Sequence, residues 1–138
     1  MSHPKITVAT TIGADVNKVW EYYTDPRHIV GWNFAADDWK CPNASNDLRP
    51  GGKYKARMEA KDGSFGFDFE AIYDEVVPQK KITYTIADGR QATTTFEPGG
   101  SGTLVTTTFD AEGQNSAELQ KNGWQAILNN FKKYTESN

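Results

Sequence analysis

The sequence predicts an α+β fold, in which a curved antiparallel sheet of about seven strands carries a long C-terminal helix across its concave face. Residues 53–109 alternate between apolar and polar side chains and contain regular turn signals, which is typical of an antiparallel meander. The C-terminal segment changes to helical spacing. A chain of 138 residues has room for one domain, so we expect residues 1–138 to form a single domain.

Two short helices are expected directly after the first strand. Residues 5–12 alternate as a half-buried strand, and Gly13-Ala14 ends it. Asp15 then stands where a helix N-cap belongs, ahead of apolar residues at helical spacing, namely Val16, Val19, Trp20 and Tyr23. Asp25 and Pro26 form a second start signal, for a short helix. We interpret residues 31–47 as a long connection, a kind of segment that is often functional.

The meander is delimited by its turns. Strands are expected over residues 53–60, 65–77, 82–86, 92–96 and 103–109. Turn signals separate them at Pro50-Gly51-Gly52, Asp62-Gly63, Pro78, Asp88-Gly89 and Pro98-Gly99-Gly100. The alternation changes parity beside Ile72, which predicts a β-bulge there.

The last segment is predicted as a helix that is long enough to cross the sheet. Asn115 and Glu118 have the spacing of a capping box, and the apolar stripe ends near Tyr134. Because this is the only long helix expected, it must cover the apolar face of the sheet. The curvature of the sheet leaves a space beneath the helix, which aromatic side chains either fill or line.

Composition and charge exclude several classes of protein. The chain has 15 basic and 18 acidic residues and a formal net charge of −3, which gives no electrostatic reason to expect nucleic acid. A single cysteine excludes an intramolecular disulfide and a cysteine-rich zinc site. We find no run of about 18 apolar residues, so no membrane span is expected. No secretory signal is recognisable, and the free Cys41 fits a reducing compartment, so we expect a cytoplasmic location.

The sequence offers little for catalysis, and we expect no metal ion and no cofactor. The two histidines are His3, near the terminus, and His28. Cys41 could act as a nucleophile only with His28 as its base; the alternative is an unreactive loop thiol beside a surface imidazole. Asp37-Asp38 is either a catalytic pair or a solvated one. Charged residues of opposite parity to the apolar ones should face water on the convex side: Asp68, Glu70, Lys53, Lys55 and Arg57.

The aromatic residues provide the main functional signal. Several large apolar side chains are placed to lie between sheet and helix, where each either packs in the core or lines a pocket: Trp20, Trp32, Trp39, Tyr54, Met58, Phe67, Phe69, Tyr84, Phe96 and Trp124. Arg49, His28 and Tyr84 are candidates for a polar group that orients a ligand at the pocket mouth.

Order and spacing of the motifs resemble the helix-grip fold of the START-related, birch-pollen-allergen-like superfamily (SRPBCC). Within it the chain is similar to the homologues of the activator of heat-shock protein 90 ATPase. The resemblance extends from about Ile6 to about Tyr134 and rests on Val19-Trp20, Thr24-Asp25-Pro26, Trp32, residues 47–52, Asp62-Gly63, Pro78 and Gly123-Trp124.

The resemblance implies a largely hydrophobic internal cavity. Three functions are therefore carried forward. The first is a module that binds an apolar or amphipathic, lipid-like small molecule. The second is a regulator of heat-shock protein 90, although the chain corresponds only to the C-terminal-type domain of the activators. The third is an enzyme of the cyclase or aromatase type, which we rank last because few ionisable residues should face the cavity. The sequence does not decide the oligomeric state, and both a monomer and a weak dimer are compatible with it.

Overall fold

The fold is a strongly curved antiparallel sheet that wraps around one long helix. The computed structural model describes residues 4–138. Within this range seven strands pair in the order β1-β7-β6-β5-β4-β3-β2, all antiparallel. The strands are β1 (Lys5–Ile12), β2 (Trp39–Asn46), β3 (Lys53–Ala60), β4 (Gly66–Val77), β5 (Lys81–Ile86), β6 (Gln91–Gly99) and β7 (Gly102–Asp110). The helices are α1 (Val16–Thr24), α2 (Pro26–Ile29) and α3 (Ala117–Ser137).

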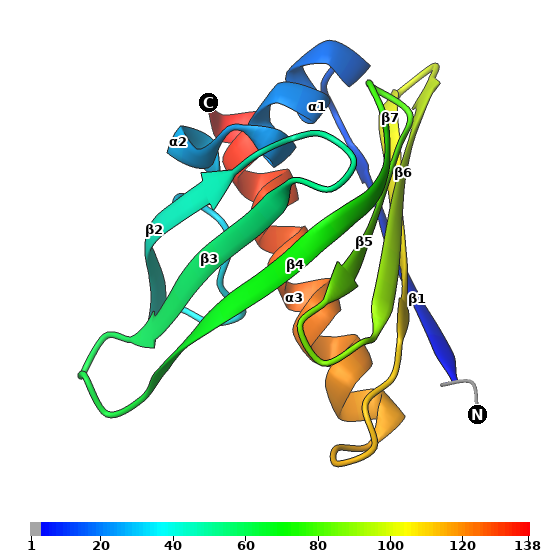
Figure 1. Cartoon of the computed structure of the whole chain (residues 1–138). Coiled ribbons are helices and arrows are strands. Elements are labelled where there is room, and N and C mark those ends of the chain that lie inside the picture. Colours follow the sequence, from blue (N-terminus) through cyan, green and yellow to red (C-terminus); the bar gives the residue numbers. More distant parts are fainter. Residues whose placement is uncertain (1–3) are drawn as a thin grey trace.

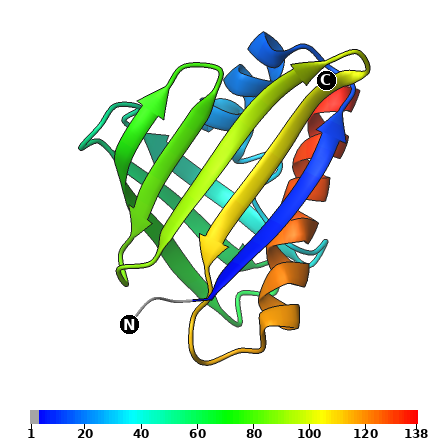
Figure 2. The same ribbon diagram turned by 90° about the vertical axis from the view of Figure 1, so that its right-hand side faces the viewer.

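Helix α3 crosses the concave face of the sheet (Figure 1), and Figure 2 shows the strands from their outer side with β1 next to α3. Gln125 Nε2 donates to the Ala9 carbonyl at 3.1 Å, and Lys132 Nζ donates to the Thr11 carbonyl at 2.6 Å. At the interface, Val105 and Phe109 of β7 and Phe131 of α3 are fully buried. The predicted α+β class, and the position of the long helix across the sheet, are therefore confirmed.

Helices α1 and α2 begin at the residues that the sequence predicts. The Asp15 carboxylate accepts hydrogen bonds from the amides of Asn17 and Lys18, at 2.9 and 3.1 Å. Asp25 accepts from the Arg27 amide at 2.9 Å, with Pro26 in the first turn of α2. These side chains satisfy amides that have no partner inside the helix, which is why acidic caps favour these starts.

The start of α3 lies one residue beyond the predicted cap. Ser116, not Asn115, is the N-cap, and its Oγ accepts from the Leu119 amide at 3.1 Å. Asn115 instead donates from its backbone and its side-chain amide to Glu112 Oε1, at 2.8 and 2.7 Å. Serine and asparagine are equally good N-caps, so their propensities do not distinguish Ser116 from Asn115. The capping-box spacing to Glu118 therefore led to the wrong prediction, Asn115.

Strand β2 was missed in the sequence analysis, because it lies inside residues 31–47, which we predicted as a connection. It pairs with β3 at an edge of the sheet, with a register shift between Lys40 and Asn43. An edge strand needs only one paired side, so it tolerates Pro42 and a polar composition that hides the period of two. Cys41 is its one buried residue.

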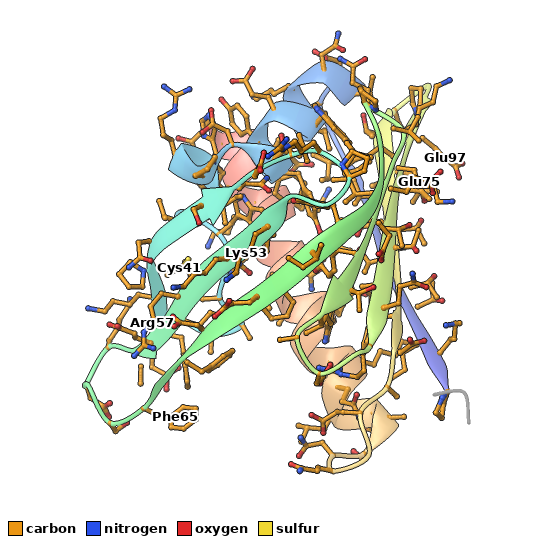
Figure 3. All side chains as sticks on the ribbon, in the orientation of Figure 1. Cys41, Lys53, Arg57, Phe65, Glu75 and Glu97 are labelled. Atoms are coloured by element: carbon orange, nitrogen blue, oxygen red, sulfur yellow. The ribbon has the colours of Figure 1, made fainter. Side chains whose placement is uncertain are left out.

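The bulge predicted near Ile72 is confirmed in β4, where the register shifts between Tyr73 and Glu75. The charged outer face is also confirmed, because Lys53 Nζ lies 2.5 Å from Glu70 Oε1 and Arg57 Nη1 lies 3.5 Å from Asp68 Oδ1. Phe65, predicted as the first residue of the strand, precedes β4 in the turn instead. It lies near the tip of the β3–β4 hairpin (Figure 3) and is 62% exposed.

Candidate functional site: two adjoining cavities beneath helix α3

A cavity of about 310 Å³ lies between α3 and the concave face of the sheet. Its walls come from distant parts of the chain, with Trp124, Ile127 and Leu128 on α3 and the remainder on the sheet and its loops. Most of this lining is apolar or aromatic: Val8, Tyr23, Trp32, Tyr54, Met58, Phe67, Phe69 and Tyr84, besides the three residues of α3. We call this space the inner cavity.

Aromatic contacts hold the walls apart. Tyr54, Phe69 and Tyr84 form a triangle with ring centroids 6.0–6.1 Å apart. On the opposite wall, the Trp124 indole stacks on Phe109 with centroids 4.0 Å apart. Rings that are braced against one another in this way cannot easily rotate into the space, so the inner cavity stays open.

Hydroxyl and amide groups interrupt the apolar lining. Asn33, which is buried, donates from Nδ2 to the Tyr54 hydroxyl at 2.9 Å. The Tyr84 hydroxyl has no hydrogen-bond partner among residues 4–138. Burial raises the pKa of Tyr23, Tyr54 and Tyr84, so all three phenols stay protonated at neutral pH and can donate a hydrogen bond.

One end of the lining carries charged groups that already have partners. The Arg90 side chain is only 14% exposed; its Nε donates to Asp88 Oδ2 at 2.7 Å and its Nη1 to the Asp110 carbonyl at 3.3 Å. Glu112 also lines the inner cavity, and its Oε1 accepts the two bonds from Asn115. These pairs lower the cost of keeping charge beside an apolar space.

A second space, of about 370 Å³, adjoins the first and is called the outer groove. Four residues line both spaces: Met58, Phe67, Trp124 and Ile127. The rest of the groove is formed by Phe34, Ala35, Ala36 and Trp39 and by the N-terminal half of α3 and its cap region: Asn115, Leu119, Gln120 and Gly123. Phe67 and Leu119 are 40% and 59% exposed, so the groove opens to solvent.

Eight of the twelve residues that the sequence selected line these spaces. Trp32, Tyr54, Phe69 and Tyr84 line the inner cavity and Trp39 lines the outer groove, whereas Met58, Phe67 and Trp124 line both.

The other four selected residues lie elsewhere. Phe96 is buried beneath α1 and packs edge-to-face against Trp20, with ring centroids 5.3 Å apart. The His28 ring stacks on Tyr22, and its Nδ1 shares a hydrogen bond of 2.9 Å with the Tyr134 hydroxyl. Arg49 is exposed and pairs with Asp47.

Sequence reasoning did not select the polar residues of the lining, Asn33, Arg90, Thr107 and Glu112. A signal existed for two of them, because Arg90 and Thr107 have the parity of the buried residues Ala92 and Phe109. Asn33 and Glu112 lie in irregular segments, where no period indicates the direction of a side chain.

The remaining chemical candidates do not meet. Cys41 is buried, and its thiol donates weakly to the Asn43 carbonyl at 3.5 Å, whereas His28 contacts Tyr22 and Tyr134. Asp37 and Asp38 are exposed. His3 lies outside the described residues. Residues 4–138 contain no group of three or more His, Cys, Asp or Glu side chains that could hold a metal ion. In the same range no helix is long and apolar enough to cross a bilayer.

Comparison with known families identifies the architecture. The family model described as activator of Hsp90 ATPase homolog 1-like protein matches residues 13–136. The chain belongs to this family. The sequence resemblance to the activator homologues, and to the superfamily that contains them, is therefore confirmed.

Solved structures agree with this membership. An activator of Hsp90 ATPase homolog 1-like protein from Aeromonas hydrophila is 38% identical with a TM-score of 0.92, over 97% of this chain and 93% of that one. A protein from Cytophaga hutchinsonii is 48% identical with a TM-score of 0.83, over 96% and 92%. A protein from Chromobacterium violaceum shares the fold at 24% identity, with a TM-score of 0.86 over 96% and 98%. No curated protein matches the chain.

Proposed function

We propose that this member of the activator of Hsp90 ATPase homolog 1-like family binds an apolar or amphipathic small molecule in the inner cavity, with the outer groove as its entrance. The observation that supports this proposal is the open space of about 310 Å³ itself, which persists although seventeen aromatic residues are available to fill it (7 Phe, 6 Tyr and 4 Trp). Apolar cavities of about half this size already bind benzene.

The size of the space limits the ligand. At the packing density of a protein interior, about 310 Å³ accommodates roughly 230 Å³ of ligand atoms. This volume suits one or two rings or a short branched chain. A longer amphipathic molecule would extend past Met58 and Trp124 into the outer groove, because these residues line both spaces.

Burial of the ligand provides the driving force. A ligand that hides about 200 Å² of apolar surface gains roughly 5 kcal/mol, from which the cost of immobilising it is subtracted. Affinity in the micromolar range therefore also needs good shape complementarity and a few polar contacts.

Met58 provides the test, because its side chain lies between the two spaces. Met58→Trp adds an indole that occupies the inner cavity, so we expect at least tenfold weaker binding of a neutral hydrophobic probe such as N-phenyl-1-naphthylamine. The matched control is Ile72→Trp, since Ile72 is on the outer face of β4 and 44% exposed. Equal binding by the two variants and the wild type would show that the inner cavity is not the binding site.

A second candidate function follows from the family's description, which names an activator of the Hsp90 ATPase. This family membership favours a chaperone contact, with the chain acting as a regulator of ATPase activity. The two functions separate in one assay. A change in the Hsp90 ATPase rate that persists in Met58→Trp would support a protein contact independent of the cavity, whereas no change and no complex would exclude it.

A further inference from the structure

The hydroxyl groups of the inner cavity restrict its ligand further than its size does. Tyr54 accepts a hydrogen bond from Asn33, at 2.9 Å, but no described residue accepts the proton of its own hydroxyl. The Tyr84 hydroxyl makes no hydrogen bond to residues 4–138. The two rings lie almost parallel, with centroids 6.0 Å apart and an interplanar angle of 16°. The inner cavity therefore contains two phenolic donors, on neighbouring rings, that protein atoms leave unused.

A phenolic donor that no protein group accepts is available to a ligand, because an acceptor on the ligand can take the place of water as the partner of that proton. Neighbouring tyrosines show the usual arrangement. The Tyr73 hydroxyl donates to Asn46 Oδ1 at 2.6 Å, although its ring lies only 6.1 Å from that of Tyr84. Tyr73 does not line the inner cavity, whereas Tyr54 and Tyr84 do. The unused donors thus coincide with the open space.

We propose that the inner cavity selects a neutral ligand with a hydrogen-bond acceptor, such as a ketone, ester or ether oxygen, which receives the hydroxyl protons of Tyr54 and Tyr84. This inference rests on the proposed function, since it concerns the same cavity. It adds the chemical class of the ligand, a neutral carbonyl or ether compound, and assigns two residues that determine specificity.

Negative charge does not suit this position. The same burial that raises the pKa of the Tyr54 and Tyr84 phenols disfavours any anion beside them. The nearest cation in the lining, Arg90, is already engaged by Asp88 and the Asp110 carbonyl, and Glu112 adds a negative charge to the same lining. A carboxylate ligand would therefore lose its hydration and gain no free cation.

The experiment uses three probes with two phenyl rings on one bridging carbon, namely benzophenone, diphenylmethane and diphenylacetate, with affinities measured by equilibrium dialysis. Tyr84→Phe removes one hydroxyl and keeps the ring. We expect it to weaken benzophenone binding about three- to tenfold, the value of one hydrogen bond, and to change diphenylmethane binding less than twofold. Tyr54→Phe should act in the same direction. Tyr73→Phe is the matched control, and it should leave the ratio of the two affinities unchanged.

A spectroscopic readout separates hydrogen bonding from packing. In the wild type the carbonyl stretching band of bound benzophenone should lie at lower wavenumber than in an alkane. In the double variant with Tyr54→Phe and Tyr84→Phe it should return toward the alkane value.

Three outcomes overturn the inference. Equal losses for benzophenone and diphenylmethane in Tyr84→Phe would show that the hydroxyl is not a specific donor. A carboxylate that binds most tightly, and loses affinity in Arg90→Gln, would transfer recognition to Arg90. Met58→Trp could weaken diphenylmethane binding while the tyrosine variants leave the preference for benzophenone over diphenylmethane unchanged. That result would support the proposed function and contradict the role of the two hydroxyls. If none of the three probes binds, the proposed function fails together with this inference.

Discussion

Cys41 shows how a residue's surroundings decide its chemistry. In the sequence it is a lone thiol that could be catalytic, but in β2 it is 4% exposed and its thiol contacts only the Asn43 carbonyl among hydrogen-bond acceptors of the described residues. Burial raises its pKa to about 11, from an ordinary value of 9.0. The thiolate is the reactive form, so this environment suppresses nucleophilic chemistry.

We therefore expect native Cys41 to react with iodoacetamide at pH 8 at least about 100-fold more slowly than the same thiol in the unfolded chain, because two pKa units reduce the thiolate fraction by that factor. Mass spectrometry of the alkylated protein with time provides the measurement. An accessible reference thiol is obtained by Ser64→Cys combined with Cys41→Ser, since Ser64 is exposed in the β3–β4 turn. Similar alkylation rates for Cys41 and for the thiol introduced by Ser64→Cys, both measured in the folded protein, would contradict the prediction.

The parity of residues along a strand is the most reliable sequence signal at this scale. It correctly predicted Asp68 and Glu70 on the outer face, where they pair with basic side chains of β3. It could not distinguish Phe96 from Tyr84, since both point to the concave face. Helix α1 covers the first through ring contacts from Trp20 and Tyr23, whereas the second lines the inner cavity.

Among the elements, α2 is short and depends on its cap. Asp25 accepts hydrogen bonds from the Arg27 side chain and from the Arg27 amide, and these bonds lower the pKa of the carboxyl to about 2, from an ordinary 3.8. A carboxyl whose pKa is lower in the folded state stabilises the fold above its unfolded pKa, and this contribution disappears as the pH falls from about 4 to about 2.

The variant Asp25→Asn tests whether the charge of the Asp25 carboxylate stabilises the start of α2. Asparagine is an equally good N-cap, so the variant should lose only the charge-dependent part, at most about 1 kcal/mol at pH 7 because Arg27 is exposed. The stability difference between wild type and variant should shrink to zero between pH 4 and pH 2 in urea unfolding. Asp37→Asn, at an exposed position, is the control. A difference that stays constant down to pH 2 would mean that the charge of Asp25 plays no part.

Strand β2 marks the limit of element prediction from sequence. Strands β1 and β3–β7 were predicted because at least one face is apolar, and their turns contain Gly, Pro or Asp in the expected places. In β2 the backbone pairing with β3 supplies the structure, and Trp39 and Cys41 are the only large or buried apolar side chains that contribute. A strand of this kind is determined by its neighbour more than by its own sequence.

At the scale of the molecule, cavity and stability are linked. A ligand that binds the folded state alone stabilises it by RT ln(1 + [L]/Kd), which is about 1.4 kcal/mol at ten times Kd. For a chain of 138 residues this raises the melting temperature by roughly 5 °C. Benzophenone should produce such a shift in the wild type and in Ile72→Trp, but not in Met58→Trp, as measured by differential scanning calorimetry. A shift of equal size in Met58→Trp would place the binding elsewhere.

The fold was predictable from the sequence to a greater extent than the site. Strands β1 and β3–β7 and the length of α3 follow from local periods, and the motif order reveals the family. The open volume depends on how α3 seats on the sheet, through contacts such as Trp124 on Phe109 and Trp32 on Phe131, with ring centroids 4.0 and 4.8 Å apart. These contacts join different elements of the fold, so no pattern within one element could give the size of the space between them.

The placement of the indoles has a practical consequence. Of the four tryptophans, Trp32 and Trp124 line the inner cavity, Trp39 lines the outer groove together with Trp124, and Trp20 lines neither. A ligand that enters through the outer groove would pass Trp39 and then bind beside Trp32 and Trp124. The molecule thus carries its own optical reporter: emission from three sites should respond to occupancy, and Trp20 provides an internal reference that needs no dye or label.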